Sequence, residues 1–343
     1  MRVLHITSTY LPDSYGGIET VVRQICLNTK IHGVENRIMT LSVNPFPQVN
    51  IVDGVEVFRA QQNFVIQSNR FSLSAFSIFR DLVEWADIVH YHFPWPFADL
   101  LHVFCKVNKK SIVTYHSDIV RQKKLSLLYS PLMNTFLKSI NKIVSTSPNY
   151  FQSSSVLKKY KDKVEVIPIG ISENSYPTPL DSELSSVQNI VGKDFFLFIG
   201  MFREYKGLKY LIEAIQQIPE QFIIAGSGKL EVKLKRLANN LGLTNVHFIG
   251  RVSDIEKVAL FKLCKAIVFP SIRRSEAFGV TLVEGAMYGK PLVSTEIGTG
   301  TSYINLNEKT GIVIPPKDTK ALKSAIMRIS SDLSLSKKMG YSS

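Results

Sequence analysis

The segment Ala266–Thr295, AIVFPSIRRSEAFGVTLVEGAMYGKPLVST, holds the pattern that decides the fold. A short apolar run, Ala266–Pro270, is followed by a polar loop and a segment of helical length, and the apolar run Pro291–Thr295 closes the unit. Runs that are apolar on successive residues are typical of parallel strands covered by helices on both faces. We therefore expect a strand, a helix and a second parallel strand here.

The same alternation extends outward in both directions from this segment. In the second half of the chain the expected strands are Phe195–Gly200, Gln221–Gly226, Asn245–Gly250, Ala266–Pro270, Pro291–Thr295 and Ile312–Ile314. In the first half they are Arg2–Ser8, Arg37–Ser42, Val55–Ala60, Asp87–His92, Ser111–His116, Lys142–Ser147 and Val164–Pro168. Amphipathic segments between them include Ile18–Lys30, Leu208–Gln217, Lys229–Leu241 and Glu256–Leu263. Two such arrays predict an α/β protein of two doubly wound, Rossmann-like domains.

A stretch rich in Ser, Pro and Asn separates the two arrays and shows no hydrophobic periodicity. We therefore expect one domain over residues 1–168, a linker over 169–192 and a second domain over 193–331. Residues 332–343 are expected to be a tail without a further element. Ligands bind at the carboxyl ends of parallel strands, so two domains that face each other would have their active site in the cleft between them.

Composition excludes several classes of protein. The 343 residues are 45% hydrophobic, which argues against disorder, and no uncharged apolar run approaches the ~20 residues that span a bilayer. The N-terminus alternates like a buried strand and lacks the features of a signal peptide. Cys26, Cys105 and Cys264 show no metal-binding spacing and are typical of a reducing compartment. We expect a cytoplasmic protein.

The formal net charge is +13, from 41 Lys and Arg against 28 Asp and Glu, and the excess is spread along the whole chain. Such an excess suits an anionic partner: a nucleotide diphosphate, a nucleic acid or an anionic membrane surface. We expect no nucleic-acid partner, because no basic stripe is interleaved with aromatic residues.

Two glycine motifs follow expected strands. Gly16 and Gly17 stand immediately before the helix Ile18–Lys30, where backbone can approach a phosphate closely and helical N–H groups can bind it, although a simple tight turn explains the pair equally well. Gly226-Ser227-Gly228 lacks the third glycine of a dinucleotide fingerprint, and the following Lys229 lacks the Ser or Thr of a P-loop. Dinucleotide and ATP sites of the standard kinds are therefore disfavoured.

Charged residues mark the carboxyl ends of strands in the second half. Arg203 and Lys206 follow the strand Phe195–Gly200 and could clamp a diphosphate from one side, although by themselves they fit a solvated basic turn equally well. Glu276 and Glu284 are eight residues apart, or ~2.2 helical turns, and are expected on nearly one face of a helix that begins at Phe278.

The chemistry of this block suits a sugar nucleotide. Carboxylates can accept hydrogen bonds from sugar or ribose hydroxyls, and the N–H groups of Phe278 and Gly279 could bind phosphate. The alternative is a surface helix with two stray glutamates. The apolar residues between them, such as Val280 and Leu282, argue against that alternative.

His116 ends an expected strand, and His90 and His92 flank the end of the preceding one, so the three could line one site. His5, His32, His102 and His247 are expected to be structural. The histidines and carboxylates show no metal-triad spacing and no D-x-D occurs, so we expect no metal cofactor.

Together these motifs resemble the retaining GT-B glycosyltransferases of family 4. The resemblance covers essentially the whole chain and is carried by Gly16-Gly17, His116 in Tyr-His-Ser-Asp, Arg203 with Lys206, and Glu276-Ala-Phe-Gly with Glu284. The segments His90–Leu100, His116–Lys124 and Ile297–Asn305 are similar to bacterial mannosyltransferases of O-antigen or capsule synthesis. The loop Gly298-Thr-Gly300 departs from the family's double glycine with a following Glu.

The resemblance implies a role for each matching residue. The backbone at Gly16 and Gly17 would contact the donor diphosphate, which Arg203 and Lys206 would neutralise. Glu276 would hold hydroxyls of the donor sugar and Glu284 those of the ribose. His116 would approach the donor sugar, Arg251 and Val252 would frame the base, and Phe278 and Gly279 would complete the donor site.

The resemblance further implies a metal-independent retaining transferase that moves a sugar, with GDP-mannose favoured as donor, to a glycan or polyprenyl-diphosphate-linked acceptor. Such an acceptor would bring the enzyme to the anionic inner face of the cytoplasmic membrane. A UDP-sugar donor remains open as an alternative. A non-catalytic sugar-nucleotide or glycan-binding scaffold is the other alternative, which loss of Arg203, Lys206 or Glu276 would have favoured.

Overall fold

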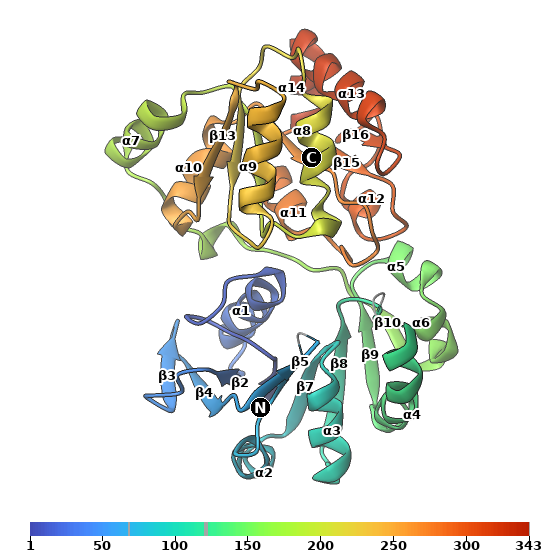
Figure 1. The fold of residues 1–343 in the computed structure, drawn as a ribbon. Coiled ribbons are helices and arrows are strands. Elements are labelled where there is room, and N and C mark those ends of the chain that lie inside the picture. Colours follow the sequence, from blue (N-terminus) through green and yellow to red (C-terminus); the bar gives the residue numbers. More distant parts are fainter. Residues whose placement is uncertain (68, 120–122, 343) are drawn as a thin grey trace. The chain divides into compact units, whose positions relative to one another are not determined.

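The computed structural model describes residues 1–67, 69–119 and 123–342, with the backbone alone for 123–127 (Figure 1). The chain divides into two compact units, Met1–Ile169 and Gly170–Ser343. Within the described ranges no helix is long and apolar enough to cross a membrane.

The first unit is built on an eight-stranded sheet of order β10-β9-β8-β7-β1-β2-β4-β3. Its strands are β1 (Arg2–Ile6), β2 (Glu35–Ser42), β3 (Val49–Val52), β4 (Val55–Gln61), β7 (Ile88–Phe93), β8 (Lys110–Tyr115), β9 (Lys142–Ser145) and β10 (Val164–Val166). All neighbours are parallel except β3 and β4, an antiparallel pair joined at Asp53-Gly54, where both φ angles are positive as a tight hairpin turn requires. The unit also holds the hairpin β5 (Phe64–Ile66) and β6 (Asn69–Phe71).

The helices of this unit connect the parallel strands. They are α1 (Gly17–Lys30), α2 (Ala75–Trp85), α3 (Pro96–Phe104), α4 (Lys123–Ser139), α5 (Pro148–Ser153), α6 (Ser155–Lys159) and the 3₁₀ turn η1 (Lys161–Lys163). Parallel strands need such crossovers, which explains why apolar runs alternate with helical segments in the sequence.

The second unit has a six-stranded, fully parallel sheet of order β13-β12-β11-β14-β15-β16. Its strands are β11 (Phe196–Ile199), β12 (Phe222–Ala225), β13 (Val246–Gly250), β14 (Ala266–Phe269), β15 (Leu292–Thr295) and β16 (Gly311–Ile314). Its helices are α7 (Asp181–Val191), α8 (Leu208–Ala214), α9 (Glu231–Asn240), α10 (Asp254–Leu263), α11 (Val280–Met287), α12 (Thr301–Ile304), α13 (Thr319–Ser331) and α14 (Leu333–Tyr341), with 3₁₀ turns η2 (Glu173–Ser175) and η3 (Glu204–Lys206).

Alternate residues of the central strand β11 enter two separate hydrophobic cores. Phe196 and Phe198 pack with α8, α9 and α13 on one face of the sheet, whereas Leu197 packs with α10 and α11 on the other. Both faces are therefore buried, as the unbroken apolar sequence of these strands predicts.

The expected linker is wrong in part, because residues 181–191 form helix α7. Asp181 and Glu183 favour the first turn electrostatically, and Glu183 Oε2 accepts a hydrogen bond from the Leu180 N–H (2.8 Å). Val187 and Val191 pack against the core that contains Leu197. Two valines four residues apart, among mostly polar residues, were too weak a pattern to predict a helix.

The expected tail is also wrong, because residues 333–341 form helix α14. The Asp332 side chain caps it by accepting from the Leu335 N–H (2.8 Å), and Met339 is fully buried. A Cβ on Gly340 would lie 2.2 Å from the Gly289 carbonyl oxygen, so the backbones approach too closely for any other residue.

Candidate active site

In the second unit, two loops at the carboxyl edge of the sheet pack so closely that glycine is required at their contact. A Cβ on Gly226 would lie 2.0 Å from the carbonyl oxygen of Gly200, and one on Gly228 would lie 2.8 Å from the nitrogen of Phe202. The Phe202 N–H also donates to the Ser227 carbonyl (2.9 Å). Close packing of loops explains this Gly-Ser-Gly motif without a dinucleotide.

Lys206 and Glu276 form a buried ion pair. Their side chains are only 12% and 11% exposed, and Lys206 Nζ contacts Glu276 Oε2. Ser271 Oγ donates to the same oxygen (3.2 Å), and the ammonium lies 4.5 Å from the centre of the Phe269 ring. Burial by itself would lower the pKa of Lys206, but the charge and hydrogen bond of Glu276, together with Tyr205, raise it overall, so the lysine stays charged.

The arrangement leaves hydrogen-bonding capacity on both groups. Among the described residues, Oε1 of Glu276 has no hydrogen-bond partner, so it can accept from a ligand hydroxyl. Arg203 precedes η3, is exposed and makes no ion pair within the described part of the chain. Its nearest polar contact is Met201 Sδ, at 3.8 Å from Nη2. Lys206, which is fixed by an ion pair, and Arg203, which forms none with the described residues, are thus close in sequence at one edge of the sheet.

Glu284 lies inside α11 and is buried. Its Oε1 accepts from Tyr176 Oη (2.9 Å) and from Lys257 Nζ (3.0 Å), whereas Oε2 has no partner among the residues described. Burial would lower the pKa of Lys257, but Glu284, then Asp254, raise it. Burial and Glu284 both raise the pKa of Tyr176, so its hydroxyl remains a donor. Sequence reasoning missed Tyr176 and Lys257, which lie 108 and 27 residues from Glu284.

The expectation that both carboxylates share one helix face is wrong for Glu276. Helix α11 begins only at Val280, and its N-cap, Gly279, has φ 95°, a left-handed conformation that ends the preceding loop. Glu276 therefore lies in the loop, where its N–H donates to the Arg273 carbonyl (3.0 Å). The Gly279 N–H therefore belongs to the N-terminal end of α11, whereas the Phe278 N–H lies one residue before the N-cap.

The loop Gly298-Thr-Gly300 packs directly on the residues before α11. The Gly300 N–H donates to the Ala277 carbonyl (2.8 Å), and a Cβ on Gly300 would lie 2.8 Å from Phe278 Cα. Arg274 Nη1 donates to the Gly298 carbonyl (2.9 Å). This loop therefore supports the segment that carries Glu276.

Arg251 and Val252 follow β13 and differ in their surroundings. The Arg251 Nε–H donates to Ser227 Oγ (2.9 Å), which attaches the guanidinium to the Gly-Ser-Gly loop. Val252 is half-buried and packs against the core that contains Leu197, so much of its side chain is used in packing.

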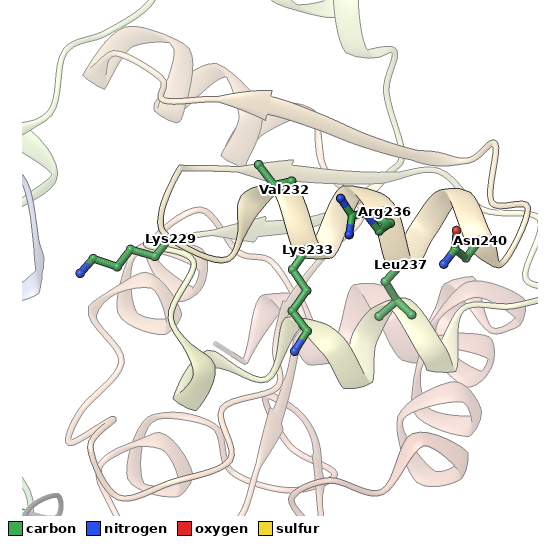
Figure 2. Close-up of a pocket in the computed structure, with 6 residues that line it drawn as sticks. All are labelled: Lys229, Val232, Lys233, Arg236, Leu237 and Asn240. Carbon is green, nitrogen blue, oxygen red and sulfur yellow. The ribbon is translucent and has the colours of Figure 1, made fainter.

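A separate hollow of about 530 Å³ lies along α9. Figure 2 shows that its lining comes from this helix and from the loop just before it; the residues are Lys229, Val232, Lys233, Arg236, Leu237 and Asn240. None of the predicted site residues lines it.

In the first unit, Gly16 caps α1 and Gly17 is its first residue. A Cβ on Gly16 would lie 2.7 Å from the Glu19 carboxylate, which is buried and accepts from Thr9 Oγ1 (2.7 Å). A Cβ on Gly17, by contrast, meets no described atom within 4 Å. The fold therefore does not require glycine at position 17, and the space beside it is open to a ligand.

His116 follows β8 and belongs to a cluster of buried imidazoles. Its Nε2 lies 3.0 Å from His92 Nδ1, and His92 Nε2 lies 3.3 Å from His5 Nδ1. His90 stacks on His92 with ring centres 4.6 Å apart. Burial lowers the pKa of His5 and of His116 to about 4, so both are neutral at pH 7. The sequence indicated His116, His92 and His90, but His5 was expected to be merely structural.

Comparison with known proteins assigns the family. Residues 15–175 match the model described as Glycosyltransferase Family 4, and residues 182–343 match Glycosyl transferases group 1. The D-rhamnosyltransferase WbpZ of Pseudomonas aeruginosa is 50% identical over 326 residues, covering 95% of this chain and 86% of WbpZ. The O-antigen chain mannosyltransferase C of Escherichia coli is 44% identical over 344 residues, covering 100% and 92%. The chain is a family 4 glycosyltransferase.

The glycosyltransferase also has the fold of its expected class. It superimposes on the sucrose-phosphate synthase of Thermosynechococcus elongatus with a TM-score of 0.80 and 20% identity, covering 99% of this chain and 92% of that one. At this identity the likeness concerns the fold alone, and it confirms the GT-B architecture of two Rossmann-like domains.

Proposed function

We propose that this glycosyltransferase moves a sugar, with retention, from GDP-mannose to a lipid-linked glycan acceptor in O-antigen synthesis. The relative of Escherichia coli, 44% identical, is named an O-antigen chain mannosyltransferase, which supports both the pathway and the sugar. Rhamnose is the second candidate sugar, because a relative that is 50% identical is named a D-rhamnosyltransferase.

The buried Lys206–Glu276 pair beside the exposed Arg203 carries this proposal. Departure of a nucleoside diphosphate creates negative charge, which the ion-paired Lys206 and the exposed Arg203 would stabilise more strongly in the transition state than in the ground state. Glu276 keeps Lys206 charged and oriented through Oε2 and accepts a donor-sugar hydroxyl through Oε1. Glu284 accepts a ribose hydroxyl through Oε2, and Tyr176 and Lys257 hold its other oxygen.

The same cations make a metal ion unnecessary in the proposed reaction. No D-x-D motif is present in the sequence to bridge a divalent cation to the diphosphate. Transfer should therefore persist in excess EDTA. Complete loss of transfer that Mn²⁺ restores would overturn the metal-free part of the proposal.

A panel of donors tests the rest. GDP-mannose, GDP-rhamnose, UDP-glucose and UDP-N-acetylglucosamine are each incubated with the protein and a lipid-linked glycan acceptor, and the released nucleoside diphosphate is measured. The melting temperature is measured with each donor alone. We expect release of GDP from GDP-mannose and the largest thermal shift with that donor. Release of UDP with no response to either GDP-sugar would show that the donor is a UDP-sugar and not GDP-mannose. No release from any donor would favour a sugar-nucleotide-binding scaffold.

A further inference from the structure

A continuous row of buried hydrogen bonds runs from the main chain of α1, at Cys26, to His116. Asn36 Oδ1 lies 3.1 Å from His5 Nε2, His5 Nδ1 lies 3.3 Å from His92 Nε2, and His92 Nδ1 lies 3.0 Å from His116 Nε2. These residues come from β2, β1, β7 and the end of β8, four neighbouring strands of the sheet. All four side chains are less than a tenth exposed.

At the Asn36 end of the row, a main-chain carbonyl determines which groups donate and which accept. Asn36 Nδ2 lies 3.3 Å from the carbonyl oxygen of Cys26 and 3.0 Å from Thr29 Oγ1. A carbonyl oxygen can only accept, so the amide NH₂ group must face it, and the amide oxygen must face His5. His5 Nε2 therefore carries the proton and donates to Asn36.

In each neutral imidazole, the protonation of one nitrogen fixes that of the other, and so determines which nitrogen of the next ring must donate. A neutral ring has one N–H donor and one bare acceptor nitrogen, so a proton on His5 Nε2 leaves Nδ1 bare. His92 Nε2 must then be the donor to His5, which leaves His92 Nδ1 to accept from His116 Nε2. Burial keeps the rings neutral, because it lowers the pKa of His5 and His116 to about 4 and that of His92 well below its ordinary value.

We propose that Asn36, His5 and His92 form a relay that fixes one tautomer of His116, with the proton on Nε2 and a bare Nδ1 turned to the substrate. Nδ1 has no hydrogen-bond partner among the described residues, and His116 retains 7% exposure. His116 can then accept a hydrogen bond from a hydroxyl of the substrate sugar but cannot donate one. This role rests on the proposed function, in which His116 approaches the donor sugar, and it makes His5 and His92 positioning residues.

His90 offers a matched control within the same cluster. It lies on β7 two residues before His92, is half-buried, and stacks on His5 and His92 at ring-centre distances of 5.0 and 4.6 Å. Its Nε2 bonds Thr114 Oγ1 (2.7 Å), so it stands outside the relay. Replacing either histidine by Phe removes one imidazole of the cluster and keeps a ring, but only His92→Phe breaks the row of hydrogen bonds.

The tautomer is measured directly by long-range ¹H–¹⁵N correlation spectra of protein labelled with ¹⁵N-histidine, without substrate. In the wild type we expect His116 as a single tautomer with Nε2 protonated and Nδ1 bare between pH 6 and 8. In His92→Phe the His116 signals should become those of a tautomer mixture, whereas His90→Phe should leave them unchanged. A wild-type His116 with Nδ1 protonated, or a mixture, would overturn the relay even if no variant folds.

Kinetics and metal analysis complete the test. His92→Phe should lower kcat/KM for the donor about tenfold relative to His90→Phe, the effect of one misdirected hydrogen bond. If the wild type shows the single tautomer but transfers no sugar, the relay stands and the proposed function fails. The ring nitrogens of His5, His90 and His92 lie within 4.8 Å of one another, and stoichiometric zinc in the purified protein would overturn the relay, because a metal would occupy the lone pairs.

Discussion

Arg203 and Glu276 are single residues whose removal tests the proposed chemistry most directly. We expect Arg203→Ala, Glu276→Ala and Glu276→Gln each to lower turnover about 10²-fold or more, because each removes a contact to charge or hydroxyls in the transition state. Arg203→Ala should keep the melting temperature, since the side chain is exposed and without an ion pair among the described residues. Measured kcat and thermal unfolding decide the matter.

The two Glu276 variants separate chemistry from folding. Glu276→Ala leaves the buried Lys206 unpaired, which costs stability, whereas Glu276→Gln retains a carbonyl oxygen for the ammonium. Arg236→Ala, a change of an exposed arginine on α9, is the control and should keep full turnover. Near-wild-type turnover in Arg203→Ala or Glu276→Gln would remove these residues from the site.

Glu284 should act on donor affinity rather than on the chemical step. We expect Glu284→Ala to raise the donor KM about tenfold or more, as loss of a hydrogen bond to a charged group does, with a smaller rise in Tyr176→Phe, which keeps the carboxylate and its Lys257 partner. Steady-state kinetics with varied donor distinguish the two effects. A fall in kcat at unchanged KM would contradict a ribose-binding role.

The sequence could indicate those site residues that have a local signal, and it missed those whose role depends on a partner far away in the chain. Lys206, Glu276 and Glu284 each stand out because a charged residue follows or accompanies an apolar strand or helix. Tyr176 and Lys257 gave no such signal, since their role exists only once the tertiary structure brings them to Glu284. His5 was hidden in the same way inside an apolar strand.

Among the elements, the start of α1 offers a test in which stability and binding should change in opposite directions. Gly17→Ala places a methyl group where no described atom lies within 4 Å, and alanine in a helix is about 0.5–1 kcal/mol more favourable than glycine. We therefore expect an equal or higher melting temperature together with weaker donor binding, measured by calorimetry. Unchanged donor affinity would mean that the pair Gly16-Gly17 is only a turn.

The elements that the sequence missed are those with weak or short signals. The apolar strands and long helices were predicted because each buries a continuous face. Helix α7, by contrast, packs only two partly buried valines against a core, and α14 packs Met339 and the partly buried Leu335. The helix around Glu284 was predicted to start too early, because nothing in the sequence distinguishes the left-handed Gly279 from a glycine inside a helical turn. The Asp53-Gly54 dipeptide is typical of a hairpin turn, but the alternation of strands and helices that predicts parallel sheets gives no place to an antiparallel pair.

For the whole molecule, the excess of positive charge bears on where the enzyme works. A polyprenyl-diphosphate-linked acceptor is held in a membrane, so we propose that basic clusters of the first unit contact anionic lipid. The predicted clusters were Lys106/Lys109/Lys110 with Arg121/Lys123/Lys124, and Lys158/Lys159/Lys161/Lys163. Arg121 and the side chains of Lys123 and Lys124 lie outside the described residues.

The structure divides the second cluster into supporting and free cations. Lys159 Nζ donates to Asn134 Oδ1 (3.0 Å) and Lys163 Nζ to the Ile140 carbonyl (2.8 Å), so both tie together elements of the first unit. Lys158 and Lys161 are exposed and make no hydrogen bond through their ammonium groups to described residues. A test by mutation should therefore change Lys158 and Lys161 and spare the other two.

Liposome co-sedimentation with the double variant Lys158→Ser/Lys161→Ser is the decisive experiment. Each cation near an anionic surface contributes roughly 1 kcal/mol within a Debye length, so the wild type should pellet with anionic vesicles, dissociate as salt rises, and bind about 30-fold more tightly than the variant. Lys229→Ser/Lys233→Ser, just before and on α9, removes the same charge from the second unit and should bind like the wild type. Equal pelleting with neutral vesicles, or equal loss in both variants, would show that these lysines contribute only net charge and that the first unit has no particular membrane face.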